Sequence, residues 1–222
     1  MTGSLALVGG AAFGATLDHH RGVIPEGATV TFLPTAKAYE NPAALVDSAE
    51  QHIEALGATL EVVPVYSRAD ASDPARVEQV ERAEVLYLAG GSPMHLRSVL
   101  VDSPLLEAGL RAWEGGTTVV AEAEATSVLC SHMVDNRGGA FTVGVGLIRS
   151  FTVIGRFDRW SPDKRHRTVG LAPADLPVVG IDEATTLLRD ESGNWTSFGA
   201  GEVHVFTGGH RVGLDRLPRD LT

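Results

Sequence analysis

Short apolar runs alternate with helix-like segments along the first 140 residues of the chain. Each run has the length of a strand and is bounded by glycine, proline or polar residues, as is typical of buried parallel strands. This alternation predicts a doubly wound α/β sheet, in which sites form at the carboxyl ends of the strands. We expect strands near residues 4–9, 28–34, 59–66, 84–89 and 117–121.

The segment 41–57 shows why the intervening stretches are predicted to be helices. Asn41 can cap a helix, Pro42 suits its first position, and Gly57 can end it. Between these signals, apolar residues recur at helical spacing, at Leu45, Ala49, Ile53 and Leu56. Further helices are expected at 74–83, after Pro93, and from about 103 to 114.

The pattern changes after about residue 140, where strand candidates become short and are interrupted by glycines and turns. The stretch "ESGN" (191–194) is a predicted hairpin turn, and "SPDKRHRT" opens with a Ser-Pro helix start. We expect largely antiparallel edge strands here, mainly after residue 175. No linker is visible, so residues 1–222 are expected to form one domain, with a mostly parallel sheet and antiparallel C-terminal strands.

Composition and charge limit the kinds of molecule that the chain is expected to bind. The chain has 222 residues, 44% of them hydrophobic, which suffices for one substantial core. Its formal net charge of −10 would repel nucleic acid and anionic lipid, so neither is an expected partner. The start lacks the basic segment and long apolar run of a signal peptide or membrane span. We expect a cytoplasmic protein without a cofactor that acts on a small-molecule substrate or ligand; a homodimer is compatible with this composition.

Cysteine and histidine usage argues against a metal site. Cys130 is the single cysteine, which excludes an internal disulfide and a cysteine-based zinc site, and we expect it to be a small buried hydrophobic residue. The histidines of "DHH" (18–20), together with His95 and His132, show no recognised spacing of metal ligands. We therefore expect the "DHH" stretch to be a loop with exposed histidines and predict no metal.

A glycine pair at one predicted strand end is the first candidate for chemistry. In "AGGSPMHL" (89–96), Gly90 and Gly91 end a strand, and Ser92 precedes Pro93 at the start of a helix. Glycines allow a close backbone approach, and their N–H groups could hold an anion or oxyanion. A tight strand-to-helix turn with no chemical role fits the same residues.

Five stretches carry a family resemblance that spans about residues 4–206. They are "FLPTAKAYENP", "LYLAGGSPMHLRSVL", "VLCSHMVDNRGGAFTVGVGL", "FDRWSPDKRHRT" and "VVGIDEATTLL". Together they resemble the cyanophycinase and α-aspartyl dipeptidase (dipeptidase E) family of serine peptidases, and more narrowly the type 1 glutamine amidotransferase-like proteins. The resemblance implies a Rossmann-like, class I glutamine amidotransferase-like three-layer sandwich. It also implies a Ser-His-acid hydrolase that acts on small peptides or isopeptides with acidic residues.

The triad of the resembled family does not carry over intact. Counting back from "VLC" places its nucleophilic serine at Ala123, whereas counting forward from "VVA" places it at Glu124. We prefer Ala123, because a deletion in the following helix would rotate its buried face by about 100° per residue. The family's histidine falls on Arg156. Its glycine pair is matched by Gly90 and Gly91, and its acid by Glu183 or Asp182.

Four charged residues remain as candidates for altered chemistry: Glu122, Glu124, Arg156 and Glu183. Converging carboxylates could raise one another's pKa and form an acid–base pair, while Arg156 could neutralise them or clamp a substrate carboxylate. Side-chain alternation indicates that only one of Glu122 and Glu124 points into the site. Because no glycine flanks Ala123, we expect the turn there to be relaxed rather than a strained nucleophile elbow.

Two classes of function stay open at this stage. One is an enzyme repurposed for non-serine chemistry on a small substrate that bears a carboxylate or amide. The other is a catalytically inactive pseudoenzyme that binds a small ligand or partner subunit. An open polar pocket would favour the enzyme, and a pocket closed by Arg–Glu pairs the pseudoenzyme. A displaced nucleophile is a further alternative, at Ser127, Ser92 or Ser131, although Ser127 is better explained as capping its own helical turn.

Overall fold

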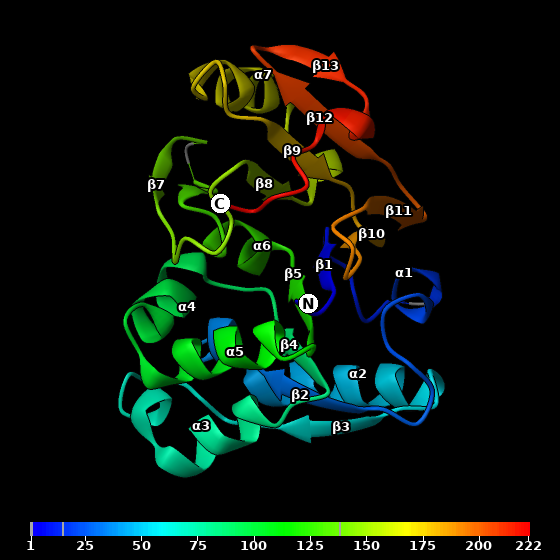
Figure 1. Cartoon of the computed structure of the whole chain (residues 1–222), viewed down its shortest axis with the longest axis vertical. Helices are drawn as coiled ribbons and strands as arrows, with labels where there is room; N and C mark the ends of the chain where they lie inside the picture. Colours follow the sequence, from blue (N-terminus) through cyan, green and yellow to red (C-terminus); the bar gives the residue numbers. More distant parts are fainter. Residues whose placement is uncertain (1, 15, 138) are drawn as a thin grey trace.

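The computed structural model describes residues 2–14, 16–137 and 139–222. At its centre lies a seven-stranded sheet with the order β11-β10-β1-β5-β4-β2-β3 (Figure 1). Five of these strands are parallel and match the five expected ones. They are β1 (Leu5–Val8), β2 (Thr29–Leu33), β3 (Thr59–Val62), β4 (Val85–Leu88) and β5 (Thr118–Glu122).

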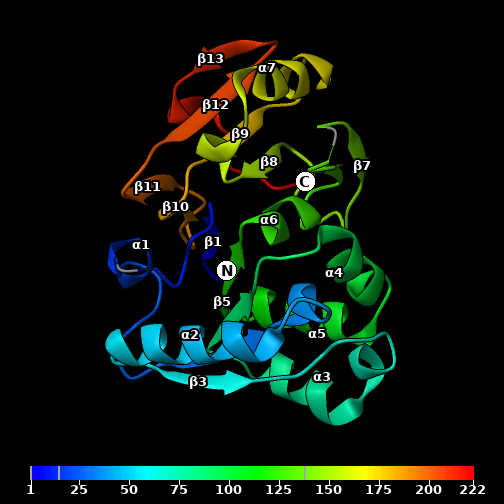
Figure 2. The ribbon, with the colours of Figure 1, turned by 180° about the vertical axis from the view of Figure 1, so that it is seen from behind.

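Helices cover both faces of this sheet, which gives the expected three-layer α/β sandwich. On one face α2 (Pro42–Ala55) packs over Ala6 and Val8 of β1. On the other face Leu5 and Leu7 of β1 join the core beneath α3 (Pro74–Glu81), α4 (Pro93–Leu100) and α5 (Pro104–Glu114). The alternation of side chains along a strand thus supplies both cores. Two opposite views show α2 on one side and α4 and α5 on the other (Figures 1 and 2).

Capping side chains followed by proline start each of the longer helices. A proline at the first helical position lacks only an N–H that would have no intrahelical partner, and the preceding polar side chain accepts a backbone N–H of the first turn. Ser92 caps α4 in this way, with its Oγ 3.3 Å from the N–H nitrogen of His95. The other caps are Asn41 for α2, Asp73 for α3, Ser103 for α5 and Ser161 for α7 (Pro162–Leu171).

The C-terminal third extends the central sheet and also builds a second one. The strands β10 (Thr185–Arg189) and β11 (Trp195–Gly199) form the expected hairpin, which pairs antiparallel with β1. Asp190 holds its turn by accepting the N–H groups of Ser192 and Asn194. The second sheet has the order β13-β12-β9-β8, with β8 (Thr152–Gly155), β9 (Val178–Ile181), β12 (Val203–Thr207) and β13 (His210–Val212).

The C-terminal pairings are largely antiparallel, as expected, but β8 and β9 pair in parallel. The physical reason is α7, which lies between them in the sequence and provides the crossover that a parallel pair requires. The remaining elements are short: α1 (Asp18–Arg21), α6 (Glu124–Val128), and the two-stranded ribbon of β6 (His132–Val134) and β7 (Phe141–Val143). Among the helices of the described residues, none is long and apolar enough to cross a membrane.

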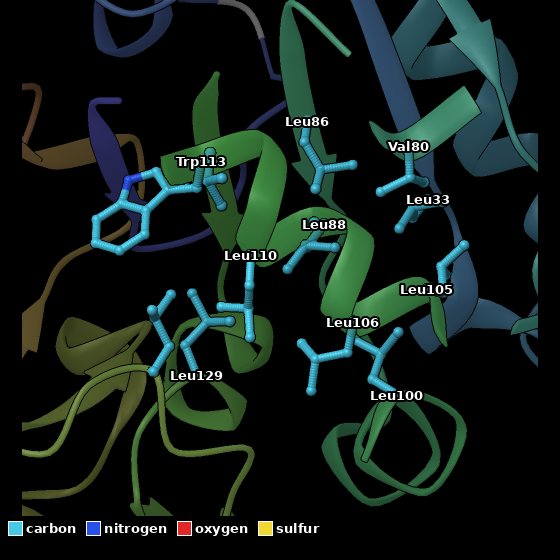
Figure 3. A pocket seen from close by; sticks show the side chains of 13 residues that line it. Leu33, Val80, Leu86, Leu88, Leu100, Leu105, Leu106, Leu110, Trp113 and Leu129 are labelled. Carbon is cyan, nitrogen blue, oxygen red and sulfur yellow. The ribbon is translucent and has the colours of Figure 1, made fainter. Parts of the chain in front are cut away.

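A small apolar cavity of about 40 Å³ lies between α5 and the sheet (Figure 3). Leucine side chains surround it, including Leu86, Leu88 and Leu110, and its thirteen lining residues include no ionisable group. Such a cavity offers no group for acid–base or nucleophilic chemistry, so we place no function there.

Candidate functional site

The carboxyl ends of three neighbouring strands bring the predicted residues together. In the parallel pairing of β1 with β5, Val8 lies opposite Glu122, and in that of β4 with β5, Leu88 lies opposite Ala121. The segments that follow these strands therefore leave the sheet side by side. They contain Gly9 and Gly10 after β1, Gly90 and Gly91 after β4, and Ala123 and Glu124 after β5.

The second sheet delivers the remaining two candidates to the same place. Arg156 directly follows β8, and Glu183 lies two residues after the end of β9. The N–H of Arg156 donates to the carbonyl oxygen of Gly9 at 2.6 Å, and the N–H of Ala184 donates to that of Gly10 at 2.8 Å. The loop after β1 is thus anchored to the segments that follow β8 and β9. The site lies where the carboxyl ends of parallel strands from two sheets meet.

Ala123 has the backbone conformation of a nucleophile elbow. Its φ of 49° and ψ of −117° lie in a region that non-glycine residues rarely adopt, and its side chain is fully buried. The expectation of a relaxed turn is therefore wrong. Hydrogen bonds fix the residue on both sides, because its N–H donates to Val8 and its carbonyl oxygen accepts both the N–H and the hydroxyl of Thr126.

Glycines from other segments make room for this strained turn. A Cβ added to Gly90 would lie 2.9 Å from the Ala123 Cβ, and one added to Gly155 would lie 2.6 Å from the Ala123 carbonyl oxygen. A Cβ added to Gly91 would instead meet the carbonyl oxygen of Ala36 at 2.5 Å. The space that flanking glycines provide in an elbow sequence comes here from neighbouring strand ends.

Glu122 is a buried carboxylate beneath the turn, with 5% of its surface exposed. Its Oε2 accepts the N–H of Gly90 at 3.2 Å, and the backbone of Ala12 provides a second hydrogen bond. Burial raises the pKa of Glu122, and these bonds together with Arg156 oppose that rise without cancelling it. Because Glu122 already occupies the Gly90 N–H, that group is not free to stabilise an oxyanion as expected from the glycine pair.

Both glutamates of the turn face the site, so the expectation from side-chain alternation is wrong. Glu122 Oε2 bonds Gly90, while Glu124 Oε2 lies 3.4 Å from where a Gly90 Cβ would be. Alternation requires extended backbone at the intervening residue, and the positive φ of Ala123 breaks that requirement.

Arg156 pairs with two of the expected acids. Its Nη1 lies 3.9 Å from Glu124 Oε1 and its Nε lies 3.9 Å from Glu183 Oε1, while Arg159 also approaches Glu183 at 3.3 Å. These contacts fit the alternative in which Arg156 neutralises carboxylates of the site. Both contacts are too long for hydrogen bonds, and the buried Arg156 Nε has no hydrogen-bond partner among the described residues.

The other candidates take structural roles in this arrangement. Asp182 pairs with His204 of β12, whose Nε2 lies 3.2 Å from both carboxylate oxygens, so Glu183 is the acid that Arg156 contacts. Ser127 donates to the carbonyl oxygen of Glu124 at 2.8 Å within α6, as expected for a serine that caps its own turn. Cys130 is buried, and burial raises its pKa to about 12, which leaves the thiol protonated.

The expectation of exposed histidines in "DHH" is wrong. His19 and His20 lie in the helix α1 and are fully buried, and they meet His52 of α2. The Nδ1 of His20 is 2.9 Å from the Nε2 of His52. The spacing of α2 carried a signal for this contact, because His52 follows the buried Ala49 by three residues and so shares its helical face.

The comparisons with known proteins agree with this architecture. A model of peptidase family S51 matches residues 5–143, more than half of the chain. The chain belongs to peptidase family S51. The match covers the five parallel strands of the central sheet and the turn at Ala123, whereas Arg156 and Glu183 lie beyond it.

Two cyanophycinases are similar to this S51 protein in sequence. Those of Nostoc sp. (strain PCC 7120 / SAG 25.82 / UTEX 2576) and Trichormus variabilis (strain ATCC 29413 / PCC 7937) are each 25% identical to it over 189 residues, covering 80% of the chain. The alignment spans 63% of either relative. The S51 protein therefore corresponds to less than two thirds of each cyanophycinase.

Two solved structures resemble this S51 protein in fold. A peptidase from an acI-B1 Actinobacterium superposes with a TM-score of 0.83 at 28% identity, covering 96% of this chain and 93% of its own. A putative peptidase E protein from Listeria monocytogenes EGD-e gives a TM-score of 0.66 at 15% identity, covering 90% and 100%. The second likeness concerns the fold alone.

Proposed function

We propose that this S51 protein is a divergent member without serine peptidase chemistry, whose site binds a small carboxylate-bearing molecule through Arg156. The observation that carries the proposal is the conformation of Ala123. In an elbow, one strained residue presents its side chain at the turn, and in this chain that residue has no hydroxyl. The strained turn supports the alignment that places Ala123, rather than Glu124, at the nucleophile position.

The geometry of Arg156 supports the ligand class. A guanidinium stays charged at neutral pH and cannot act as a general base, but it binds carboxylates with two parallel hydrogen bonds. Arg156 lies between Glu124 and Glu183 at ion-pair distance without a hydrogen bond to either, and 41% of its side chain is exposed. A ligand carboxylate could therefore take the place of one glutamate and accept the hydrogen bond that the buried Nε–H does not make within the described residues.

A second candidate function is acid–base chemistry carried by Glu122. The observation in its favour is the raised pKa of this carboxyl group, which favours its protonated form more than in an exposed glutamate. Its burial and its bond to Gly90 argue for a supporting role, because a substrate must displace that bond to reach it. Nuclear magnetic resonance can monitor whether a bound ligand is converted to a product, and such conversion would distinguish this function from binding alone.

Serine-directed reagents should leave the protein unlabelled. We expect a fluorophosphonate probe to give no stoichiometric adduct by intact-protein mass spectrometry, and an aspartyl dipeptide to remain uncleaved, because Ala123 has no side-chain hydroxyl to attack either reagent. A serine peptidase treated in parallel should be labelled, which shows that the probe is reactive. Stoichiometric labelling at Ser92, Ser127 or Ser131 would contradict the proposal and show that the nucleophile has moved.

Substitution of Arg156 should weaken binding of a small dicarboxylate. We expect Arg156→Met to reduce the affinity for succinate by about 10- to 100-fold in calorimetric titration, as the loss of charge-assisted hydrogen bonds worth about 1.5–3 kcal/mol implies. Arg159→Met is the matched control, because Arg159 also contacts Glu183 but is more exposed, and we expect less than about a threefold change. Equal losses in the two variants, or no binding of succinate or L-aspartate by the unmodified protein, would contradict the assignment.

A further inference from the structure

Three buried histidines form a cluster outside the site at Ala123. His19 and His20 of α1 are fully buried, and His52 of α2 is 5% exposed. One ring nitrogen from each lies within 4.8 Å of those of the other two. Two views show α1 beside the hairpin of β10 and β11 and close to α2, so the cluster joins two helices that are separate in the sequence (Figures 1 and 2).

The outer nitrogens of these rings have partners that orient the inner ones. His19 Nε2 lies 2.8 Å from the carbonyl oxygen of Ala12, which can only accept, so this nitrogen carries the proton. The Nδ1 of His19 is then unprotonated and has a free lone pair. It is buried without a hydrogen-bond partner among the described residues. His20 Nε2 is 3.3 Å from the hydroxyl of Tyr87, and His52 has a backbone hydrogen-bond partner in Gly14.

This pattern is the one that metal-binding histidines show in proteins. A ligating imidazole usually gives its other N–H to a carbonyl, hydroxyl or carboxylate, which fixes the ring and its tautomer. Here the inward atoms are Nδ1 of His19, Nδ1 of His20 and Nε2 of His52. Burial lowers the pKa of all three histidines, which favours the neutral imidazole.

We propose that His19, His20 and His52 bind one divalent transition-metal ion of the zinc type, with water as an exchangeable fourth ligand. Three imidazoles without a carboxylate suit zinc, cobalt, nickel or copper rather than magnesium or calcium. Tetrahedral zinc holds its nitrogens about 3.3 Å apart. The 2.9 Å separation of His20 Nδ1 and His52 Nε2 is close to this, and a ring nitrogen of His19 lies within 4.8 Å of the ligand atoms of the other two.

The cluster has an access route and a proton balance that suit the ion. His52 lines a cavity of about 310 Å³ together with Phe13, Leu17 and Gln51, from which an ion and its water can enter. The hydrogen bond between His20 and His52 holds a proton that the metal must replace. That proton moves to His20 Nε2, which then donates to Tyr87, so a tautomer change of His20 makes room without charging any ring.

A bound ion would also stabilise one wall of the site at Ala123. The carbonyl oxygen of Ala12 accepts from His19, while the backbone of Ala12 hydrogen-bonds Glu122 on its other side. The segment after β1 therefore connects the histidine cluster to the buried carboxylate. The metal-site proposal does not depend on the ligand proposed for Arg156, because the two sites have no residue in common.

Metal content and spectroscopy test the site on the full chain. Protein stripped with a chelator, incubated with ZnCl2 and desalted should retain one zinc per chain, and its thermal midpoint should rise by about 5–10 °C with zinc in large excess over Kd. Substituting Co²⁺ should give the intense visible absorption of a tetrahedral site. Retention below about 0.2 zinc per chain, or a cobalt spectrum identical to that of the hydrated ion, overturns the proposal.

A matched pair of variants localises the ion. His52→Gln should lower retained zinc at least tenfold, whereas His210→Gln, which changes an exposed histidine of β13, should retain it fully. Thermal unfolding in chelator shows whether each variant is folded. If His52→Gln does not fold, the cobalt spectrum of the unmodified protein decides the question alone. Equal zinc retention by folded His52→Gln and His210→Gln overturns the assignment.

Discussion

Replacing Gly155 with alanine should destabilise the protein by about 3 kcal/mol or more. A Cβ at this position would lie 2.6 Å from the carbonyl oxygen of Ala123 and 2.8 Å from its Cα, both backbone atoms of a hydrogen-bonded turn. No side-chain rotation relieves such a contact, so β8 must move away from β5, at a cost in the upper range of overpacking. Urea unfolding followed by circular dichroism gives the free energy of unfolding.

The control for this substitution is Gly170→Ala in α7. A Cβ at Gly170 meets nothing within 4 Å, and alanine in a helix is favoured over glycine by up to about 1 kcal/mol. We therefore expect a small stabilisation from the same chemical change. A loss of less than about 1 kcal/mol in Gly155→Ala would mean that the second sheet is not held tightly against the turn at Ala123.

Much of the fold could be predicted from the order of elements along the chain. The strand expected at 117–121 is found at Thr118–Glu122, and the helix expected at 41–57 is α2 (Pro42–Ala55), because buried strands and capped helices leave strong local signals. The second sheet was not predicted. Its parallel pair depends on a contact between β8 and β9 across α7, and no local pattern specifies which sheet a short strand joins.

The sequence allowed us to predict which residues lie at the candidate site, but not the backbone conformation of the turn there. Strand ends and the family resemblance brought Glu122, Glu124, Arg156 and Glu183 together without any knowledge of coordinates. The strain at Ala123 could not be seen, because the space for it comes from glycines on other strands. The histidine cluster was missed for a similar reason, since its members come from α1 and α2 and only the fold joins them.

Replacing Glu122 with leucine should destabilise the protein by about 2–5 kcal/mol. Leucine cannot accept the N–H of Gly90 or the backbone hydrogen bond of Ala12, and each buried donor left without a partner costs about 1–3 kcal/mol. Glu122→Gln is the control, because its side-chain oxygen can accept in the same place. We expect urea unfolding to show a large loss for leucine and a much smaller change for glutamine.

The pH dependence of these variants tests the charge state of Glu122. Its folded pKa is raised, so its contribution to stability is fully present below the unfolded pKa and is lost as the pH rises through the folded value. Between the two pKa values this loss amounts to about 1.4 kcal/mol per pH unit. Glu122→Gln does not titrate, so its stability relative to the unmodified protein should increase from pH 4 to pH 7, with the contributions of other groups cancelling. If glutamine instead loses stability relative to glutamate over this range, Arg156 and the two backbone donors outweigh burial, and Glu122 is a permanent anion unsuited to act as an acid.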